Sequence, residues 1–149
     1  MMTNAAPASA ALMRPALRSE TRTHYARILA SYDVEQLAAV KQMYFLARQR
    51  LGTSGGNTAA KMLLGLYNGT RFPFDLTELR AFDDLNLCDA LAVLRMDAGF
   101  TYCEIHTLID AMFCDTYSTG VEFEYWACKL KLRGRCKKDA LASAARIRP

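Results

Sequence analysis

The sequence predicts an all-α protein, a compact single-domain bundle of about five to six helices joined by short loops. Three observations favour this class. Apolar residues recur at helical spacing along the middle of the chain, residues that cap helices precede these stretches, and short Gly, Pro and Asn segments separate them. The composition agrees, because 149 residues with 52% hydrophobic side chains are enough to bury a core.

The predicted helical domain covers residues 24–134 and lies between two basic ends. Residues 1–23 are rich in Ala, Ser, Thr and Pro and have no sustained apolar period, which predicts a flexible basic arm. An organelle transit peptide is the alternative for this segment, given its Ala, Ser and Arg content. Residues 135–149 are predicted to be a basic tail that forms a marginal helix at most.

The first two helices of the domain are predicted from their caps. Asp33 is suited to cap an apolar stripe that ends at Gly52, and Gln36 stands at the capping-box position. The Gly- and Ser-rich stretch that follows is expected to be a flexible linker. Asn57 then caps a short apolar helix, which ends at residues 68–69.

The next two helices are predicted in the same way. Asp75 is suited to cap a third helix, with Glu78 three residues later as the partner of a capping box. A fourth helix is predicted over residues 86–98, with Leu91 in its apolar stripe. Gly99 is expected to end this helix in a left-handed cap.

The last two helices complete the predicted bundle. Thr101 is suited to cap the fifth helix, with Glu104 at the capping-box position. The sixth is predicted to start near Thr119, again with an acidic residue, Glu122, three positions on. Apolar residues alternate over residues 121–125, so a β-strand is the alternative for that stretch.

Charge is distributed in three blocks along the chain. Residues 1–74 carry nine basic and three acidic groups (+6), residues 75–124 carry two and eleven (−9), and residues 125–149 carry eight and one (+7). Such blocks bear on partners rather than on fold. If the folded protein presents the middle block on its surface, it offers a partner-binding acidic face. The candidate residues of this face are Asp83, Asp84, Asp89, Asp97, Glu104 and Asp110.

The basic tail is the second predicted binding region, for a partner protein or a nucleic acid. Tyr125 and Trp126 lie beside it and are suited to stack on bases. The competing interpretation places Trp126 and Phe123 in the core and leaves the cations as solvated side chains. These cations are Lys129, Lys131, Arg133, Arg135, Lys137 and Lys138.

No catalytic residue, metal site or cofactor is predicted. Cys103, His106 and Asp110 share one face of the fifth predicted helix and are potential metal ligands, but the sequence has no CxxC or HExxH pairing. His106 is the one histidine placed to act as a base, because His24 falls in the predicted arm, and no GxSxG motif supplies a nucleophile. We therefore expect a protein that is not an enzyme. The odd number of cysteines, five, predicts free thiols in a reducing compartment.

Four segments carry a resemblance to a known family. Residues 63–69 read LLGLYNG, residues 72–80 read FPFDLTELR, residues 83–84 are DD, and residues 90–97 read ALAVLRMD. Together they resemble a family of small proteobacterial domains of unknown function that are carried by plasmids and integrative elements. A weaker likeness covers residues 120–129.

The resemblance implies no reaction and no catalytic residues. It implies a mobile-element setting, in which small proteins often inhibit host defence, anti-CRISPR proteins among them. We therefore expect a cytoplasmic, non-enzymatic protein-binding inhibitor that acts on a host defence or nucleic-acid-handling complex, without contact with a membrane. The alternative is a small nucleic-acid-binding accessory or regulatory protein that uses the basic tail and whose core forms a homodimer.

Overall fold

The computed structural model describes residues 8–114 and 118–132. These residues form helices and turns and contain no β-strand, which confirms the predicted all-α class. In chain order the helices are α1 (Ala8–Ala30), α2 (Val34–Gln49), α3 (Ser54–Tyr67), the 3₁₀ helix η1 (Leu76–Ala81), α4 (Asp84–Gly99), α5 (Ile105–Phe113) and α6 (Ser118–Lys129).

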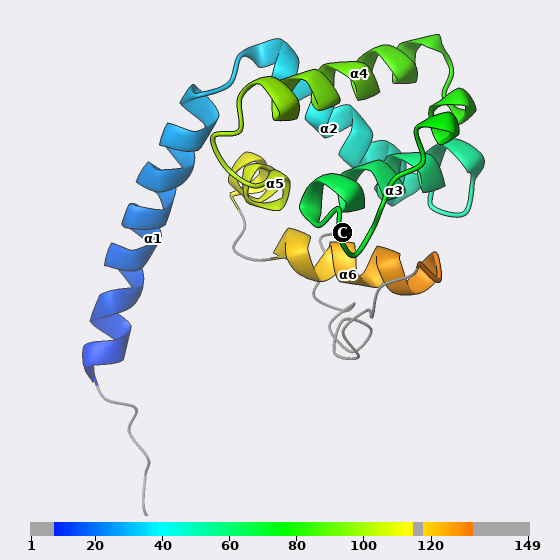
Figure 1. The fold of residues 1–149 in the computed structure, drawn as a ribbon. Helices are drawn as coiled ribbons and strands as arrows, with labels where there is room; N and C mark the ends of the chain where they lie inside the picture. The colour runs from blue at the N-terminus through cyan, green and yellow to red at the C-terminus, as the bar shows by residue number, and fades with distance from the viewer. Residues whose placement is uncertain (1–7, 115–117, 133–149) are drawn as a thin grey trace, which may run out of the picture.

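Helices α2 and α3 form the centre of the fold (Figure 1). Helix α4 packs along α2 on one side of this pair, and α6 packs against α3 on the opposite side. The Nε2 of Gln42 donates to the Oδ1 of Asn86 at 3.4 Å near one end of the α2–α4 pair, and the rings of Tyr32 and Phe100 meet at 6.3 Å near the other. Helices α2 and α4 are therefore antiparallel.

Helix α1 contradicts the prediction of a flexible arm over residues 1–23, because it begins at Ala8. Its C-terminal part packs beside α5, and Tyr25 and Ile28 are buried there (Figure 1). The prediction rested on the missing apolar stripe. Residues of good helix propensity, Ala, Leu and Arg, fill the segment instead, and the contacts at its C-terminal end hold the helix on the protein.

The start of α2 confirms the predicted capping box. The Oδ1 of Asp33 accepts from the backbone N–H of Gln36 at 3.2 Å, and the side chain of Gln36 accepts from the N–H of Asp33 at 3.0 Å. After the helix, Gly52 takes a positive φ of 98°. That conformation favours glycine, so the predicted end of the helix is also close to the observed one.

The start of α3 corrects the predicted linker and the predicted Asn57 cap. The cap is Thr53, whose Oγ1 accepts from the N–H of Gly56 at 3.2 Å. Asn57 lies inside the helix and its Oδ1 accepts from the N–H of Gly52 at 2.7 Å. A Cβ on Gly56 would lie 1.9 Å from the carbonyl oxygen of Arg50. The glycines thus belong to the helix, where they allow α3 to begin against the end of α2.

The segment after Asp75 is a 3₁₀ helix rather than the start of a longer helix. Asp75 does cap it, but its Oδ1 accepts from the N–H of Thr77 at 2.8 Å. The predicted box partner, Glu78, accepts instead from the Nζ of Lys61 at 3.2 Å. The capping box is therefore not formed, and the helix stays short.

Both ends of α4 differ from the prediction. Asp83 caps the helix by accepting from the N–H of Asn86 at 2.8 Å, so α4 begins two residues early, at Asp84. Gly99 is its last residue and keeps a negative φ, since Gly52 is the one glycine with positive φ in the described chain. The predicted left-handed cap is therefore wrong.

The predicted cap of α5 is wrong, whereas the predicted start of α6 near Thr119 is close to the observed one. The Oγ1 of Thr101 donates to the carbonyl oxygen of Asp97 at 2.5 Å, so this hydroxyl extends α4 and does not cap α5. Glu104 occupies the N-cap position of α5 without a side-chain hydrogen bond. Helix α6 begins at Ser118, one residue before the predicted cap, and residues 121–125 are helical rather than a strand.

Aromatic rings form the part of the core between α2, α3 and α6. The ring of Trp126 lies 5.9 Å from that of Tyr44 and 5.0 Å from that of Phe123, which in turn lies 5.4 Å from that of Tyr67. Trp126 and Phe123 are almost fully buried. This confirms the interpretation that places both residues in the core, and it excludes the alternative in which Trp126 stacks on bases.

Glu122 on α6 is buried and ties this helix to α2. The hydroxyl of Tyr44 donates to its Oε2 at 2.5 Å, and the Nε of Arg48 lies 3.3 Å from its Oε1. Glu122 had been predicted to complete a capping box for α6. It instead carries a negative charge into the core, where a cation and a hydroxyl compensate for the lost hydration.

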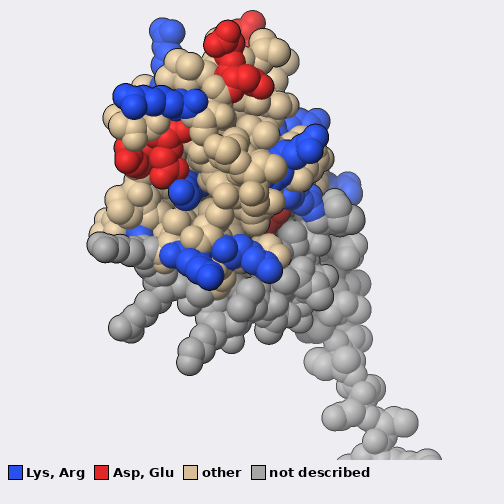
Figure 2. All heavy atoms as spheres, turned by 90° about the vertical axis from the view of Figure 1, so that its right-hand side faces the viewer, with Lys and Arg blue, Asp and Glu red and all other residues tan. Residues whose placement is uncertain are grey.

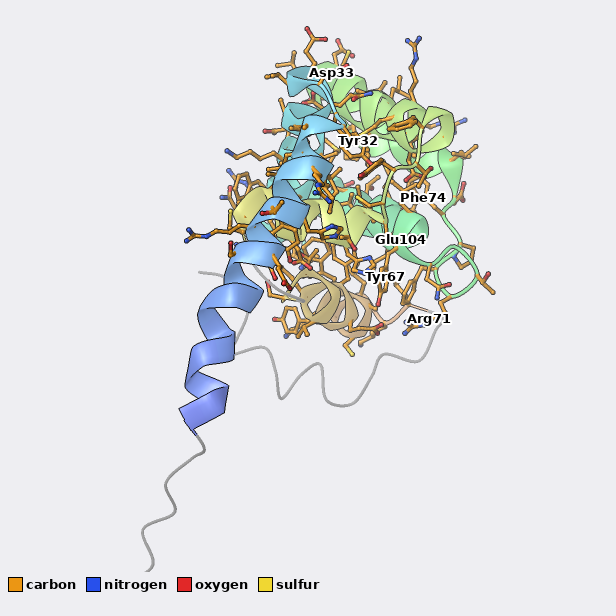
Figure 3. The ribbon with its side chains drawn as sticks, turned by 90° about the vertical axis from the view of Figure 1, so that its left-hand side faces the viewer. Tyr32, Asp33, Tyr67, Arg71, Phe74 and Glu104 are labelled. Atoms are coloured by element: carbon orange, nitrogen blue, oxygen red, sulfur yellow. The ribbon has the colours of Figure 1, made fainter. Side chains whose placement is uncertain are left out.

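Glu124 makes the second tie, to the segment that follows α3. The guanidinium of Arg71 donates to both carboxylate oxygens, at 2.6 and 2.9 Å, and the hydroxyl of Tyr67 donates at 3.3 Å (Figure 3). Hydrogen bonding to Glu124 raises the pKa of Arg71, while burial and the same carboxylate raise the pKa of Tyr67. The two-pronged geometry is the strongest form of an ion pair between side chains.

Gly56→Ala is expected to destabilise the fold by about 3 kcal/mol or more, because the added methyl group meets the backbone of α2. The matched control is Gly55→Ala. A Cβ at Gly55 has nothing within 4 Å, and alanine should stabilise the helix by up to about 1 kcal/mol. The free energy of unfolding from urea titration measures the effect of each substitution. An equal effect of the two would contradict the close contact between Gly56 and the end of α2.

Arg71→Leu is expected to destabilise the protein by about 3–5 kcal/mol, because it leaves the buried carboxylate of Glu124 without its cation. Lys61→Met removes the pair with Glu78, in which both side chains are about one-third exposed, and should cost no more than about 1 kcal/mol. Urea titration at neutral pH checks this difference. Similar costs for the two variants would show that α6 does not depend on the buried pair.

Candidate functional site

The six carboxylates of the predicted acidic face do not form one surface. Asp84 begins α4 and Asp97 lies near its end, so about 20 Å of helix separates them. Asp89 is half-buried between them, and burial raises the pKa of its carboxyl. Asp110 is buried and binds the start of α6, where its Oδ1 accepts from the N–H and the hydroxyl of Thr119 at 3.1 and 2.7 Å.

The acidic middle of the sequence is partly neutralised by ion pairs within the protein, two of them with a buried carboxylate. Glu122 pairs with Arg48, Glu124 with Arg71, and Glu78 with Lys61. On the face drawn in Figure 2, basic side chains lie beside the acidic ones in the upper part, and the lower part carries mostly basic side chains. Three acidic residues of the middle block are therefore paired with cations of the first block.

Two of the predicted carboxylates do come together, at the turn between α4 and α5. Asp97 is half-buried near the end of α4 and Glu104 is exposed at the N-cap of α5. Burial raises the pKa of Asp97, and the neighbouring charge of Glu104 raises it further. Within the described part of the chain neither carboxylate forms an ion pair, so their repulsion is not relieved.

Two aromatic rings stand beside these carboxylates. Phe100 and Tyr102 are 53% and 48% exposed, and their rings stack at 6.2 Å with 29° between the planes. The buried ring of Tyr32, just before α2 (Figure 3), meets the rings of Phe100 and Tyr102 edge-on, at 6.3 and 6.5 Å. The set Asp97, Phe100, Tyr102 and Glu104 is called the α4–α5 turn surface below.

The hydroxyl of Tyr32 fixes this turn. It accepts from the backbone N–H of Cys103 at 3.3 Å and lies 3.8 Å from the Sγ of the same residue. Sequence reasoning missed the surface because Thr101 and Glu104 had been assigned to a capping box at the start of α5. The one available signal was a pair of aromatic residues in a short turn that also carries acidic residues.

The outward face of α4 is the second surface that sequence reasoning missed. Leu85 is 80% exposed and Leu91 is 50% exposed, with Cys88 and Ala92 exposed between them. Leu91 had been predicted in the buried stripe. The helix is apolar on both sides, since Ala90, Val93 and Met96 are the residues buried against α2.

The basic tail lies mostly outside the described residues. Lys129 and Lys131 are exposed, and the Nζ of Lys129 lies 5.7 Å from the centre of the Tyr125 ring. Because Trp126 is buried, it is not available to stack on bases. The predicted residues beyond the described range are Arg133, Arg135, Lys137 and Lys138.

Cys103, His106 and Asp110 do not converge on a metal. The described residues contain no group of three or more His, Cys, Asp and Glu side chains that could hold one. Burial raises the pKa of the Cys103 thiol, which disfavours the nucleophilic thiolate at neutral pH. Cys88 and Cys114 are also free thiols, whereas Cys128 is disulfide-bonded, which departs from the prediction of five free thiols.

Both histidines of the chain line a cavity of about 340 Å³ between α1 and α5. His24 comes from α1, which the sequence analysis had treated as an arm, and His106 from α5. The Nδ1 of His106 is buried and has no hydrogen-bond partner, while the imidazole packs edge-on against Tyr67 at 5.1 Å. No carboxylate of the described residues therefore orients this imidazole through Nδ1, as a catalytic base requires. The remaining lining residues are Glu20, Thr21, Tyr25, Thr107 and Asp110.

Comparisons with known proteins place the chain in one family. Residues 37–117, more than half of the chain, match the Family of unknown function (DUF7673), and the chain belongs to it. No curated protein and no solved structure matches the chain. The matched segment runs from α2 to the end of α5 and includes both the α4–α5 turn surface and the outward face of α4. None of the described helices combines the length and apolar character needed to cross a membrane.

Asp97→Asn is expected to raise the melting temperature near neutral pH. The folded state holds the Asp97 proton at a higher pH than the unfolded chain does, so stability is lost as pH rises from the ordinary aspartate pKa through the raised one. The asparagine variant lacks this loss. Melting curves of both proteins across the acid range measure the difference, and parallel curves would contradict the raised pKa.

Asp75→Asn provides the control with the opposite sign. Hydrogen bonds from the hydroxyl and the N–H of Thr77 lower the pKa of Asp75. The stability that the ionised Asp75 contributes is present above the ordinary aspartate pKa and is lost as pH falls through the lowered pKa. The asparagine variant should therefore melt below the natural protein at neutral pH, and the difference should shrink in acid.

Proposed function

We propose that this protein is a non-catalytic protein-binding module that recognises a basic segment of a partner through the α4–α5 turn surface. The observation that carries the proposal is a stacked pair of exposed aromatic rings beside two carboxylates that form no ion pair with any described residue. Apolar rings in a rigid turn provide contact area at low entropic cost, and aromatic residues are enriched where proteins bind proteins.

The chemistry of this surface fits Arg or Lys side chains. A cation over the face of Phe100 or Tyr102 gains about 0.5–1 kcal/mol when exposed and about 2 kcal/mol when desolvated. A carboxylate within reach of the same cation adds a charge-assisted hydrogen bond. The cation also relieves the repulsion between Asp97 and Glu104, which the free protein bears. Binding a basic segment therefore removes an unfavourable interaction as well as adding favourable ones.

The attraction is local rather than global. The whole chain carries a net charge of +4, so a basic peptide gains nothing from the protein's overall charge. Specific recognition of a basic segment therefore depends on the turn surface. Nucleic-acid-handling proteins expose such segments in their binding grooves, which supports the further proposal of an inhibitor of such a complex, including one in host defence.

The proposal is tested with a fluorescent Arg-rich peptide as the probe and the full chain as the receptor. The double variant Phe100→Ala/Tyr102→Ala should weaken binding about tenfold, because two rings that contact the cations are removed. Leu76→Ala is the matched control, since Leu76 is 68% exposed on η1 and away from the turn. Circular dichroism verifies the fold of each variant.

The pH dependence of peptide binding provides a second readout. A bound cation lowers the pKa of Asp97, so binding releases a proton and should strengthen as pH rises through the raised pKa of that group. Asp97→Asn should flatten this profile. Equal binding by the natural protein and the aromatic double variant, or binding that does not respond to Asp97, would overturn the proposal.

A further inference from the structure

The outward face of α4 presents apolar side chains to solvent, and none of the described helices packs on them. Leu85, Cys88, Leu91 and Ala92 are all exposed. At 100° per residue they lie within an arc of about 120° on the helix, so they form one continuous stripe. A helix that is apolar on both sides is usually covered on both sides. Among the described helices, α2 is the one that packs extensively against α4.

Two opposite charges flank this stripe on the same face. Asp84 begins the helix and Arg95 lies 11 residues later, which is three turns, so both side chains project along one line about 16 Å apart. Both are exposed, and neither forms an ion pair within the described residues. The outward face of α4 thus has an acid at one end, a base at the other and apolar residues between them.

We propose that α4 packs against α4 of a second copy of this chain, in antiparallel orientation, about a two-fold axis that passes between residues 89 and 90. This axis brings Asp84 of one copy to Arg95 of the other, twice. It also brings Cys88 to Leu91, twice, because that pair is centred on the same point of the helix. The outward face of α4 is therefore complementary in charge and shape to the same face of a second copy, as a symmetric interface requires.

The residues at the centre of the stripe allow a close approach. Cys88 and Ala92 are small, which suits an interaxial distance of about 8–10 Å, and the leucines fill the spaces on either side. Helix α6, which ends the described chain, lies on the opposite side of α2 and α3 from α4 (Figure 1). A single helix pair buries less area than a standard interface, so the dimer is expected to form with micromolar affinity.

Charge reversal tests the arrangement. Asp84→Lys and Arg95→Glu each create two like-charge contacts in the symmetric dimer, and each should weaken self-association of the full chain about tenfold or more. The double variant Asp84→Lys/Arg95→Glu restores both contacts with exchanged signs and should recover the dimer. Sedimentation velocity over a concentration series measures the association. A double variant as weak as the single ones, or a chain that stays monomeric at every concentration, would overturn the proposal.

The thiols give a second test. About the proposed axis the two Cys88 residues are offset by roughly 4.5 Å along the helices, within reach of a disulfide. Mild oxidation should therefore yield a covalent dimer in the natural protein and in Cys114→Ser, but not in Cys88→Ser. A crosslink that survives Cys88→Ser would place the contact elsewhere. These variants leave the α4–α5 turn surface untouched, so the outcome is independent of peptide binding.

Discussion

The position of α6 depends on two carboxylates that lie inside the protein. Glu122 accepts a hydrogen bond from Tyr44 and pairs with Arg48 of α2. Glu124 accepts hydrogen bonds from both terminal nitrogens of the Arg71 guanidinium. These contacts fix the rotation of α6 about its axis, because the residues between and beside them, Phe123 and Trp126, are thereby directed into the aromatic core. Buried ion pairs add little net stability compared with apolar packing, but losing one partner is expensive. The pairs therefore serve mainly to specify a single arrangement of α6.

The burial of these carboxylates also determines which acidic side chains stay at the surface, where a partner can contact them. The acidic middle of the sequence provides the buried anions Asp110, Glu122 and Glu124, together with the helix caps Asp75 and Asp83. The three buried anions are therefore not available to a partner, whereas the two caps stay exposed. What remains is local: the turn after α4, where two carboxylates repel each other beside exposed rings.

Local signals in the sequence predicted the class of fold and some helix starts. They failed where the conformation depends on a contact with a residue far away in the sequence. The Asp33 box was predictable because both of its hydrogen bonds lie within four residues. The start of α3 was not, because it depends on how closely Gly56 approaches the end of α2. Glu122 has the spacing of a capping-box residue, and nothing near it in sequence reveals Tyr44 or Arg48. The turn surface was missed for the same reason, since Tyr32 supports it from 70 residues away.

Helix α4 carries or adjoins both surfaces for which we propose a partner, its own outward face and the α4–α5 turn surface. Its outward face ends at Arg95, and the turn surface begins two residues later at Asp97. In an antiparallel α4 pair, the two turns would project from opposite ends, each about 16 Å from the axis along the helix. A dimer would therefore hold two basic-segment sites about 30 Å apart. Two sites at that spacing bind one extended basic partner, or two neighbouring copies of it, more tightly than either site alone, because the second contact is made at a high effective concentration. A weak single site is then sufficient for stable capture.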